Sequence, residues 1–297
     1  MNLPFTLPSP AGGPPAEWTS EGFRIGSAVL PVLEFSDNFA GWSEDLTTLH
    51  EETAGASHPI DIASRNDALA QLRAKLAGNN CPVILEIGCS TGFMLKAMIE
   101  AFPDATIVGA DVVREPLLRL ARELPSVPLL RFDLLRCPLP SASFDAVVML
   151  NVLEHIEDDV AALRQVHRIL KAGGVAVIEV PAGPHLYDTY DQGLMHFRRY
   201  AMIRLSESLG AVGFEVVRRS HLGFLIYPGF AYVKRRNQRR QRRSPAVDAT
   251  SVVAKQASNT SSSLLLRGAL TIERLLGKLW SLPLGIRCVV VGRKTAH

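Results

Sequence analysis

The stretch that decides the fold runs Val83-Ile-Leu-Glu-Ile-Gly-Cys-Ser-Thr-Gly-Phe93. A run suited to a buried strand leads into a turn bounded by glycines, and a helix pattern follows over 94–101. Gly88 and Gly92 permit a positive φ and let a ligand approach the backbone closely. A helix that begins directly after such a turn presents free N–H groups to that ligand. The stretch therefore predicts a ligand site where a strand passes into a helix.

The alternation of strand and helix patterns continues along the chain. Further strands are predicted at 106–110, 129–132, 144–150, 175–180, 214–217 and 287–292. Further helices are predicted over 61–76, 115–123, 158–170 and 204–209, with Lys171-Ala-Gly-Gly174 as the C-terminal cap of the third. Strands that are apolar throughout and alternate with helices are typical of a parallel sheet covered on both faces. The sequence therefore predicts an α/β fold.

Two acidic residues stand at the ends of the next two strands. Asp111 comes nineteen residues after Gly92 and closes the second strand, and Asp133 closes the third. A carboxylate in the first of these positions can accept hydrogen bonds from ribose hydroxyls. Because the carboxyl ends of parallel strands share one edge of the sheet, these acids and the glycine turn predict a nucleoside pocket at that edge.

The turn also indicates which nucleoside is bound. It departs from the dinucleotide pattern GxGxxG, because Ser90 and Phe93 stand where two of the glycines would be. Glu86 precedes the first glycine by two residues, and its charge would repel a pyrophosphate. A carboxylate there suits an ammonium group. S-Adenosylmethionine has an amino acid group and a sulfonium and no phosphate, so we expect this cofactor rather than NAD.

With these residues the chain resembles the class I S-adenosylmethionine-dependent methyltransferases, over about residues 80 to 222 and the last strand. The stretch Glu86–Gly92 is similar to the first motif of that family, with Ser90 in place of the middle glycine. The resemblance implies a Rossmann-like sheet of seven strands in the order 3-2-1-4-5-7-6, with the last strand antiparallel and helices on both faces. It implies that the cofactor is bound by Glu86, Gly88, Cys89, Ser90, Gly92, Asp111, Val112, Asp133, Leu134 and Asn151.

The family resemblance implies methyl transfer, an in-line displacement at an activated sulfonium. The protein then mainly aligns the reactants and removes water from them. The segments 139–145 and 151–158 are similar to the small-molecule branch, methyltransferase types 11 and 12, and no Asn/Asp-Pro-Pro-Tyr-like signature is present. We therefore expect a small-molecule, glycan or lipid-linked acceptor, methylated at oxygen. Two alternatives remain, an RNA-modifying methyltransferase and a non-catalytic cofactor-binding subunit.

Residues that could act on an acceptor follow the fourth and fifth strands, where open sheets bind ligands. The candidate catalytic residues are His155, His196 and Asp191. The candidate substrate-binding residues are His185, Tyr187, Asp188, Tyr190 and Arg199. The portion His196-x-x-Arg199-Tyr200 is also similar to a family element whose residues hold the loop together, so a purely structural role is the alternative.

The chain divides into four segments. We expect residues 1–20 to lack fixed structure, because they are rich in proline and glycine. Residues 21–80 are expected to form a helical lid segment. Its part 36–62, which contains Trp42, Asp45 and His50, is expected either to close over the cofactor or to pack as a surface helix. Residues 81–222 with 285–297 form the cofactor-binding domain. Residues 223–284 are an insertion before the last strand.

Seven positive charges lie in one run of the insertion, Lys234-Arg-Arg-Asn-Gln-Arg-Arg-Gln-Arg-Arg243. The chain as a whole carries +3, so without these seven charges it carries −4. Three interpretations of the run stay open: contact with an anionic membrane, a solvated flexible loop, and binding of nucleic acid. Nucleic acid is the least favoured, because no aromatic residue interrupts the run. The apolar residues 223–233 beside it favour a membrane interface.

The insertion also contains an amphipathic helix pattern over 264–282. Arg267, Arg274 and Lys278 share one face. Much of the remaining surface is filled by Leu265, Leu266, Leu276 and Leu279. Such a helix can pack its leucines on the sheet domain or lie at a lipid interface, and packing is the commoner outcome.

The composition excludes several other classes of protein. A chain of 297 residues with 47% hydrophobic content can bury a large core, which excludes a wholly disordered protein. Its four cysteines are scattered and form no group with histidines, so we expect neither a disulfide framework nor a metal site. A secretory leader and an apolar run of about 18 residues are both lacking. We expect a cytoplasmic protein, with peripheral contact at the inner face of the membrane as the alternative.

Overall fold

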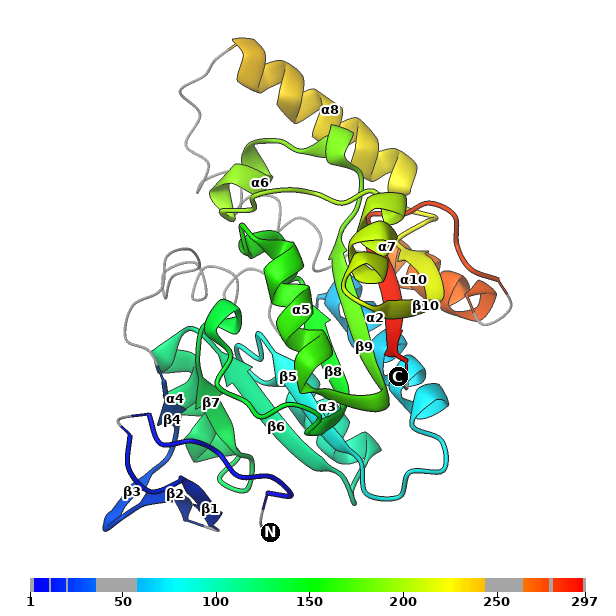
Figure 1. Cartoon of the computed structure of the whole chain (residues 1–297). Helices are drawn as coiled ribbons and strands as arrows, with labels where there is room; N and C mark the ends of the chain where they lie inside the picture. The colour runs from blue at the N-terminus through cyan, green and yellow to red at the C-terminus, as the bar shows by residue number, and fades with distance from the viewer. Residues whose placement is uncertain are drawn as a thin grey trace.

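The computed structural model describes residues 3–10, 12–19, 21–35, 58–243, 264–277 and 280–295. A mixed sheet with the strand order β10-β11-β9-β8-β5-β6-β7-β4 runs through the molecule (Figure 1). Its strands are β4 (Leu33–Glu34), β5 (Val83–Ile87), β6 (Thr106–Asp111), β7 (Leu129–Arg131), β8 (Phe144–Leu150), β9 (Leu170–Pro181), β10 (Phe214–Leu222) and β11 (Arg287–Lys294).

The predicted order of seven strands is confirmed. Strands β5 to β10 are the predicted first to sixth strands, and β11 is the seventh, antiparallel to both β9 and β10. The sheet has one strand more than predicted, because β4 pairs in parallel with β7 at the edge. Leu33 of β4 is fully buried there, and Glu34 forms an ion pair with Arg131 of β7. This eighth strand lies within a segment that was expected to be helical.

Helices cover both faces of the sheet, as predicted. The described part of the chain contains the helices α2 (Pro59–Lys75), α3 (Phe93–Ala101), α4 (Arg114–Glu123), α5 (Asp159–Ile169), α6 (Thr189–Gly193), α7 (Met202–Ala211), α8 (Tyr227–Arg243) and α10 (Leu264–Leu276). Side chains of β5 alternate between two cores, with Ile84 packed among residues of α2, α3 and α4. Leu85 packs on the opposite face, with residues of α5 and α7. This alternation explains why the strand is apolar throughout.

The amino-terminal part of the chain differs from the prediction. Residues 17–30 form a small antiparallel sheet of β1 (Glu17–Thr19), β2 (Gly22–Ile25) and β3 (Ala28–Leu30), not a helix (Figure 1). Leu7 is fully buried, and the Phe5 ring lies 5.0 Å from that of Phe144. The expectation that residues 1–20 lack fixed structure is therefore wrong for those described. The proposed lid residues Trp42, Asp45 and His50 lie outside the described residues.

The predicted glycine cap after α5 is part of a strand instead. Helix α5 ends at Ile169, and β9 begins at the next residue. The pairing with β8 passes from Leu170 directly to Val175, so residues 171–174 form a bulge within β9. Gly173 has a φ of +78°, and the Lys171 ammonium group lies 2.7 Å from Asp145 of β8. The glycines thus serve the bulge rather than the end of the helix.

The part of the insertion that forms α10 packs on the domain. Helix α10 buries Leu266 and Leu270 against a cluster that includes Ile60 of α2 and Leu222 of β10. The buried Glu273 of α10 accepts hydrogen bonds from the backbone N–H groups of Gly223 (2.6 Å) and Leu225 (3.2 Å). Of the two predicted outcomes for this helix, packing is the one observed. None of the described helices is long and apolar enough to cross a membrane.

Candidate functional site

The turn after β5 adopts the left-handed backbone that its glycines predicted. Gly88, Ser90 and Gly92 have φ values of 78°, 42° and 74°. A Cβ atom added to Gly88 would lie 2.4 Å from Val152, which follows β8, so glycine is also required for packing. Ser90 tolerates its conformation because its backbone N–H donates a hydrogen bond of 2.8 Å to Asp111. The serine in place of the middle glycine is thereby explained.

Asp111 links this turn to the end of β6. Its Oδ2 accepts the hydrogen bond from Ser90, and its Oδ1 accepts one of 3.0 Å from the backbone N–H of Val113. Each carboxylate oxygen keeps a second lone pair, which can accept a hydrogen bond from a ribose hydroxyl. Burial raises the pKa of Asp111, and the backbone N–H groups lower it. Asp133 is half-buried and accepts a hydrogen bond of 2.9 Å from Leu135 at the end of β7.

Glu86 is the group that best tests the fit of the expected cofactor. Its side chain is buried, and its Oε2 has no hydrogen-bond partner among the described residues. Burial raises the pKa of Glu86 well above its usual value, and the charge of Asp111 raises it further. A cationic group placed beside this carboxylate would satisfy the unpaired oxygen. The ammonium group of S-adenosylmethionine has this chemistry, so the residues fit the cofactor.

Arg65 of α2 is a site residue that the sequence analysis missed. Its positive charge lowers the pKa of Glu86, and its guanidinium lies 5.4 Å from the centre of the Phe93 ring at the start of α3. Burial lowers the pKa of Arg65, while the charges of Asp61 and Glu86 raise it. No motif signals this residue, because α2 reaches the glycine turn only through the packing of the sheet domain.

A second group that was missed lies at the end of β9. Glu179 is buried and accepts hydrogen bonds from Ser64 of α2 (2.8 Å) and Arg287 of β11 (2.8 Å). Asn151, a predicted cofactor residue, has a φ of 55° and places its amide 3.4 Å from the Glu179 carboxylate. Arg287 also pairs with Asp61 at 2.8 Å. This network joins α2, β9 and β11 beside the predicted pocket.

The structure brings the three predicted catalytic residues together, because His196 lies beside both His155 and Asp191. The rings of His155 and His196 lie 4.8 Å apart at an angle of 75°. His155 belongs to the short 3-10 helix η2 (Leu153–His155) after β8, and His196 follows α6. Their neighbour Glu154 is fully buried, and burial raises its pKa to about 8. Burial also lowers the pKa of His196, which favours a neutral imidazole near pH 7.

Asp191, the third predicted catalytic residue, is fully buried and engaged by its neighbours. It lies 3.1 Å from His196 Nδ1, 2.8 Å from Arg199 and 2.8 Å from Lys234 of α8. Burial raises the pKa of Asp191, but the hydrogen bond from His196 and the charges of Lys234 and Arg199 lower it well below the usual range. An ionised carboxylate only accepts hydrogen bonds, so His196 Nδ1 carries the proton. This arrangement favours a positioning role for Asp191 over the predicted role as a base.

The predicted substrate-binding residues divide into buried and accessible ones. Asp188 is buried and accepts hydrogen bonds from Lys234 (2.7 Å) and Asn237 (3.1 Å) of α8. Arg199 is buried between Asp191 and backbone carbonyls, which favours the structural alternative for this segment. Tyr187 and Tyr190 are half-buried, and His185 is exposed. These three are the members of this set whose side chains are at least partly exposed.

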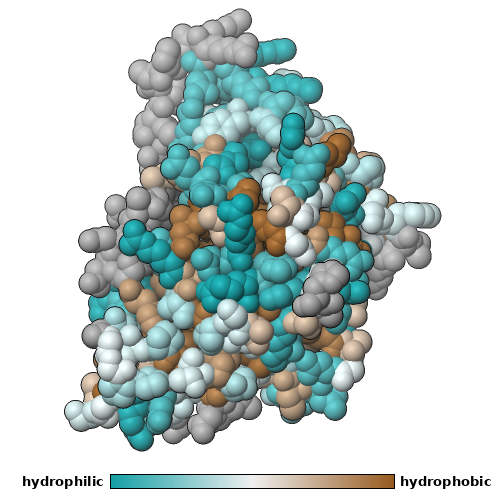
Figure 2. Space-filling model, viewed as in Figure 1, coloured by the Kyte–Doolittle hydropathy of each residue, from teal (hydrophilic) through white to brown (hydrophobic). Residues whose placement is uncertain are grey.

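The basic run lies in α8, so the solvated flexible loop was a wrong interpretation for its described residues. Lys234 is 1% exposed, and Asn237 and Gln238 donate hydrogen bonds to the segment from His185 to Asp188. Residues three and four positions apart share one face of a helix, so these three residues place one face of α8 on the loop after β9. Among the residues of the run whose burial is described, the exposed arginines are Arg235, Arg236, Arg239 and Arg240. In Figure 2 hydrophilic residues cover the upper part of the molecule, which α8 occupies in Figure 1.

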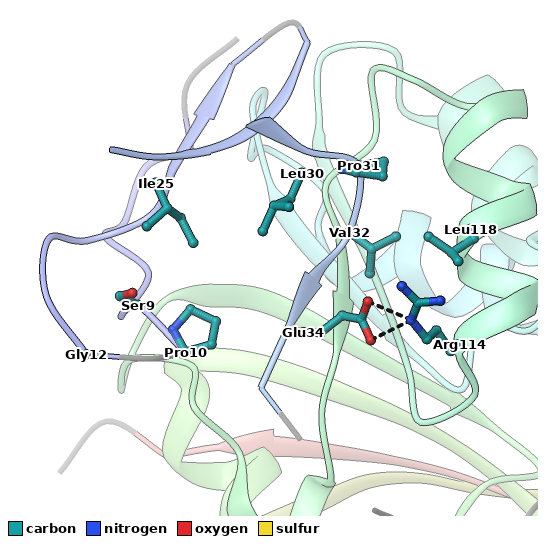
Figure 3. Close-up of a pocket in the computed structure, with 10 residues that line it drawn as sticks. All are labelled: Ser9, Pro10, Gly12, Ile25, Leu30, Pro31, Val32, Glu34, Arg114 and Leu118. Carbon is teal, nitrogen blue, oxygen red and sulfur yellow. Dashed lines mark hydrogen bonds and ion pairs between the residues drawn. The ribbon is translucent and has the colours of Figure 1, made fainter. Parts of the chain in front are cut away.

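A depression of about 320 Å³ lies elsewhere, between the β2–β3 hairpin and α4 (Figure 3). Ile25 and Leu30 line it on one side and Leu118 on the other. Its one acidic group, Glu34, is already paired with Arg114 at 2.9 Å. None of the predicted cofactor residues lines it, so we assign it no role.

Part of the chain is similar to a known protein family and to several curated proteins. A family described as "Methyltransferase domain" matches residues 85–178. A trans-aconitate 2-methyltransferase of Azoarcus sp. is 29% identical over 131 residues, which are 44% of this chain and 50% of that protein. A demethylmenaquinone methyltransferase of Thermus thermophilus is 32% identical over 125 residues, 38% of this chain and 56% of that protein. The chain thus spans about half the length of the curated relatives it matches.

Solved structures share the fold at low sequence identity. Phosphoethanolamine N-methyltransferase 2 of Haemonchus contortus, solved with S-adenosyl-L-methionine, has a TM-score of 0.52 and 15% identity, over 84% of this chain and 60% of that one. The [4+2]-cyclase SpnF has a TM-score of 0.51 and 19% identity, over 78% of this chain and 81% of that one. A methyltransferase and a cyclase therefore share this architecture, so function has to be argued from the site.

Proposed function

We propose that this chain, a member of the class I S-adenosylmethionine-dependent methyltransferases, transfers a methyl group to an oxygen of a small-molecule, glycan or lipid-linked acceptor. One observation carries the proposal. Glu86, whose Oε2 has no hydrogen-bond partner in the described part of the chain, lies in a buried strand that leads into the glycine turn, and Asp111 contacts the same turn. A buried carboxylate oxygen without a hydrogen-bond partner is costly, and a cationic ligand beside it would remove that cost.

Each end of the cofactor has residues suited to it. S-Adenosylmethionine supplies, when bound, a methyl group on a positively charged sulfur from which it is readily displaced. Glu86 would accept hydrogen bonds from the ammonium group, and Arg65 would pair with the carboxylate beside it. Asp111 would accept hydrogen bonds from the ribose hydroxyls, while Asp133 and Leu134 would lie beside the adenine. These contacts at both ends of the cofactor would fix the orientation of the sulfonium between them, which favours reaction with an acceptor aligned with it.

An oxygen acceptor has to lose its proton, and the loops after β8 and β9 offer groups that can take it. His155 is half-buried and stands next to His196. A neutral imidazole within hydrogen-bond reach of the acceptor hydroxyl can serve as the general base. His196 donates through Nδ1 to Asp191, so its Nε2 keeps a lone pair for this purpose. Two relatives named for trans-aconitate and demethylmenaquinone support an acceptor that is not a nucleic acid.

A labelling experiment tests the acceptor class. Purified protein is incubated with radiolabelled S-adenosylmethionine and fractions of a cell lysate, with and without nuclease and with organic extraction. We expect label in nuclease-resistant material of low molecular weight or in the organic phase. Asp111→Ala protein is the control, because it should lose cofactor binding.

Each other outcome of the labelling supports a different class of protein. Label that nuclease releases would identify an RNA-modifying enzyme and overturn the small-molecule proposal. Label in no fraction, together with binding of S-adenosylhomocysteine, would favour a non-catalytic cofactor-binding subunit. A methyl ester or ether in the labelled product, shown by mass spectrometry, would support transfer to oxygen.

We also propose that α8 makes peripheral contact with anionic membrane. The four exposed arginines of its run accompany Tyr232, whose side chain is 67% exposed. Clustered arginines beside an exposed aromatic residue suit a surface of anionic headgroups. Each cation near such a surface contributes about 1 kcal/mol.

Vesicle flotation tests the membrane contact. The protein should float with anionic vesicles at low salt, and less of it should float at high salt or with neutral vesicles, because salt screens the attraction. A variant with Arg235→Gln, Arg236→Gln, Arg239→Gln and Arg240→Gln should lose this flotation. Equal recovery with neutral and anionic vesicles would contradict the proposal.

A further inference from the structure

We propose that Glu154, His155 and His196 bind a divalent transition-metal ion beside the acceptor. One ligand atom from each residue lies within 4.8 Å of those of the other two. Two of the residues come from η2 after β8, and the third comes from the segment after α6, so the fold brings separate loops to one point. The role of the ion in methyl transfer rests on the proposed methyltransferase function, whereas ion binding does not. The binding itself stands on the observations that follow.

Glu154 points to a ligand that the chain itself does not supply. Its side chain is 0% exposed, and neither carboxylate oxygen has a hydrogen-bond partner among the residues that the structure describes. Its oxygen nonetheless lies within the group formed with the two histidines. A buried carboxylate without donors is destabilising, and coordination of a cation removes that cost.

His196 has the surroundings of a metal ligand. Its Nδ1 donates to the Asp191 carboxylate at 3.1 Å, which fixes the tautomer and leaves Nε2 as the electron-pair donor. Histidine ligands of metals usually have their other nitrogen held by a carboxylate in this way. Asp191 is held in turn by Arg199 and Lys234. The same contacts that make Asp191 unsuitable as a base therefore suit it to orient His196.

The donor set selects the kind of ion. One carboxylate oxygen and two imidazole nitrogens suit Zn²⁺, Mn²⁺ or Fe²⁺, whereas Mg²⁺ and Ca²⁺ prefer oxygen ligands alone. Three protein ligands leave coordination positions open for an acceptor oxygen. The histidines would then act as ligands rather than as bases.

The ion would make the acceptor oxygen more reactive. A cation next to a hydroxyl lowers its pKa, so the proton can pass to solvent water. A bond then forms between the acceptor oxygen and the methyl carbon. The bond between that carbon and the sulfonium sulfur breaks, and sulfur keeps the electron pair. Charge balances because the sulfonium becomes a neutral thioether.

Titration with Mn²⁺ tests the site directly. Full-length protein is treated with chelator and dialysed, and the unbound ion is followed by its electron paramagnetic resonance signal. We expect one ion per chain, displaced by Zn²⁺ and not by an equal concentration of Mg²⁺. Glu154→Gln, His155→Gln and His196→Gln should each weaken binding at least about tenfold. His185→Gln is the matched control, because this exposed histidine lies outside the group.

The outcomes separate this proposal from the proposed function. Failure of the wild-type protein to bind Mn²⁺ or Zn²⁺ at about 0.1 mM overturns the ion site. Binding that stays unchanged in every variant whose circular dichroism shows a folded chain overturns it as well. Titration of the same samples with S-adenosylhomocysteine tests the cofactor site independently. Cofactor binding without ion binding leaves the methyltransferase proposal standing, and the reverse result leaves only the ion site.

Discussion

Replacing Lys234 by alanine is expected to lower the free energy of unfolding by about 3 to 5 kcal/mol. The ammonium group of this residue is buried, 2.7 Å from Asp188 and 2.8 Å from Asp191. Burial raises the pKa of Asp188, and the charge of Lys234 lowers it. Without that ammonium group both carboxylates lose a hydrogen-bond donor. Asp191 keeps its ion pair with Arg199, whereas Asp188 keeps no cation among its observed contacts. Urea denaturation followed by circular dichroism measures the change.

Arg235 is the matched control for this substitution. It is the next residue of α8, carries the same charge and is exposed, so Arg235→Ala should change the free energy of unfolding by less than about 0.5 kcal/mol. Similar effects of the two substitutions would mean that the basic run acts through its net charge rather than through one buried ion pair. A Lys234→Ala protein as stable as the wild type would contradict the docking of α8 on the loop after β9.

Replacing Asp111 by alanine is expected to weaken binding of S-adenosylhomocysteine by about 100-fold or more. Each hydrogen bond from a ribose hydroxyl to the carboxylate contributes about 1.5 kcal/mol or more, so two contribute about 3 kcal/mol. Ser90 and Val113 also lose the acceptor of their backbone N–H groups, which disturbs the glycine turn itself. Isothermal titration calorimetry on the folded variant measures the change.

Asp104 provides the control for that experiment. It is an exposed acid that precedes β6, at the opposite end of the strand from Asp111. Asp104→Ala should leave the dissociation constant for S-adenosylhomocysteine unchanged. Unchanged affinity in Asp111→Ala would mean that the ribose lies elsewhere. It would also contradict the assignment of Glu86 to the ammonium group of the cofactor.

Local signals were sufficient for most of the sheet. Strands such as β5 and β8 are apolar throughout because both of their faces are covered, and this pattern is visible without knowledge of the fold. The glycine turn and Asp111 were equally predictable, since a positive φ and a carboxylate at a strand end are properties of a short stretch. The strand order came from the resemblance to the methyltransferases rather than from any single residue.

Segments that depend on distant partners were predicted less well. Strand β4 is two residues long, and it exists because Leu33 and Glu34 find partners on β7. The segment around Leu7 looks flexible by composition, yet it packs on the sheet. Residues 171–174 have the composition of a helix cap, but they form a bulge in β9 because the residues on both sides of them pair with β8. In each of these cases a tertiary contact outweighed the local preference.

The candidate site divides in the same way. By itself the sequence determined most strands of the sheet, the glycine turn after β5 and the acids at the ends of β6 and β7, because each is encoded within a few adjacent residues. Only the tertiary structure decided that Lys234 of a basic run is a buried partner of Asp188 and Asp191. It alone decided that Glu154 lies beside two histidines, with no hydrogen-bond partner for its carboxylate among the described residues. The physical reason is that burial and charge pairing depend on which loops come into contact. No local sequence pattern predicts a contact between residues more than forty positions apart.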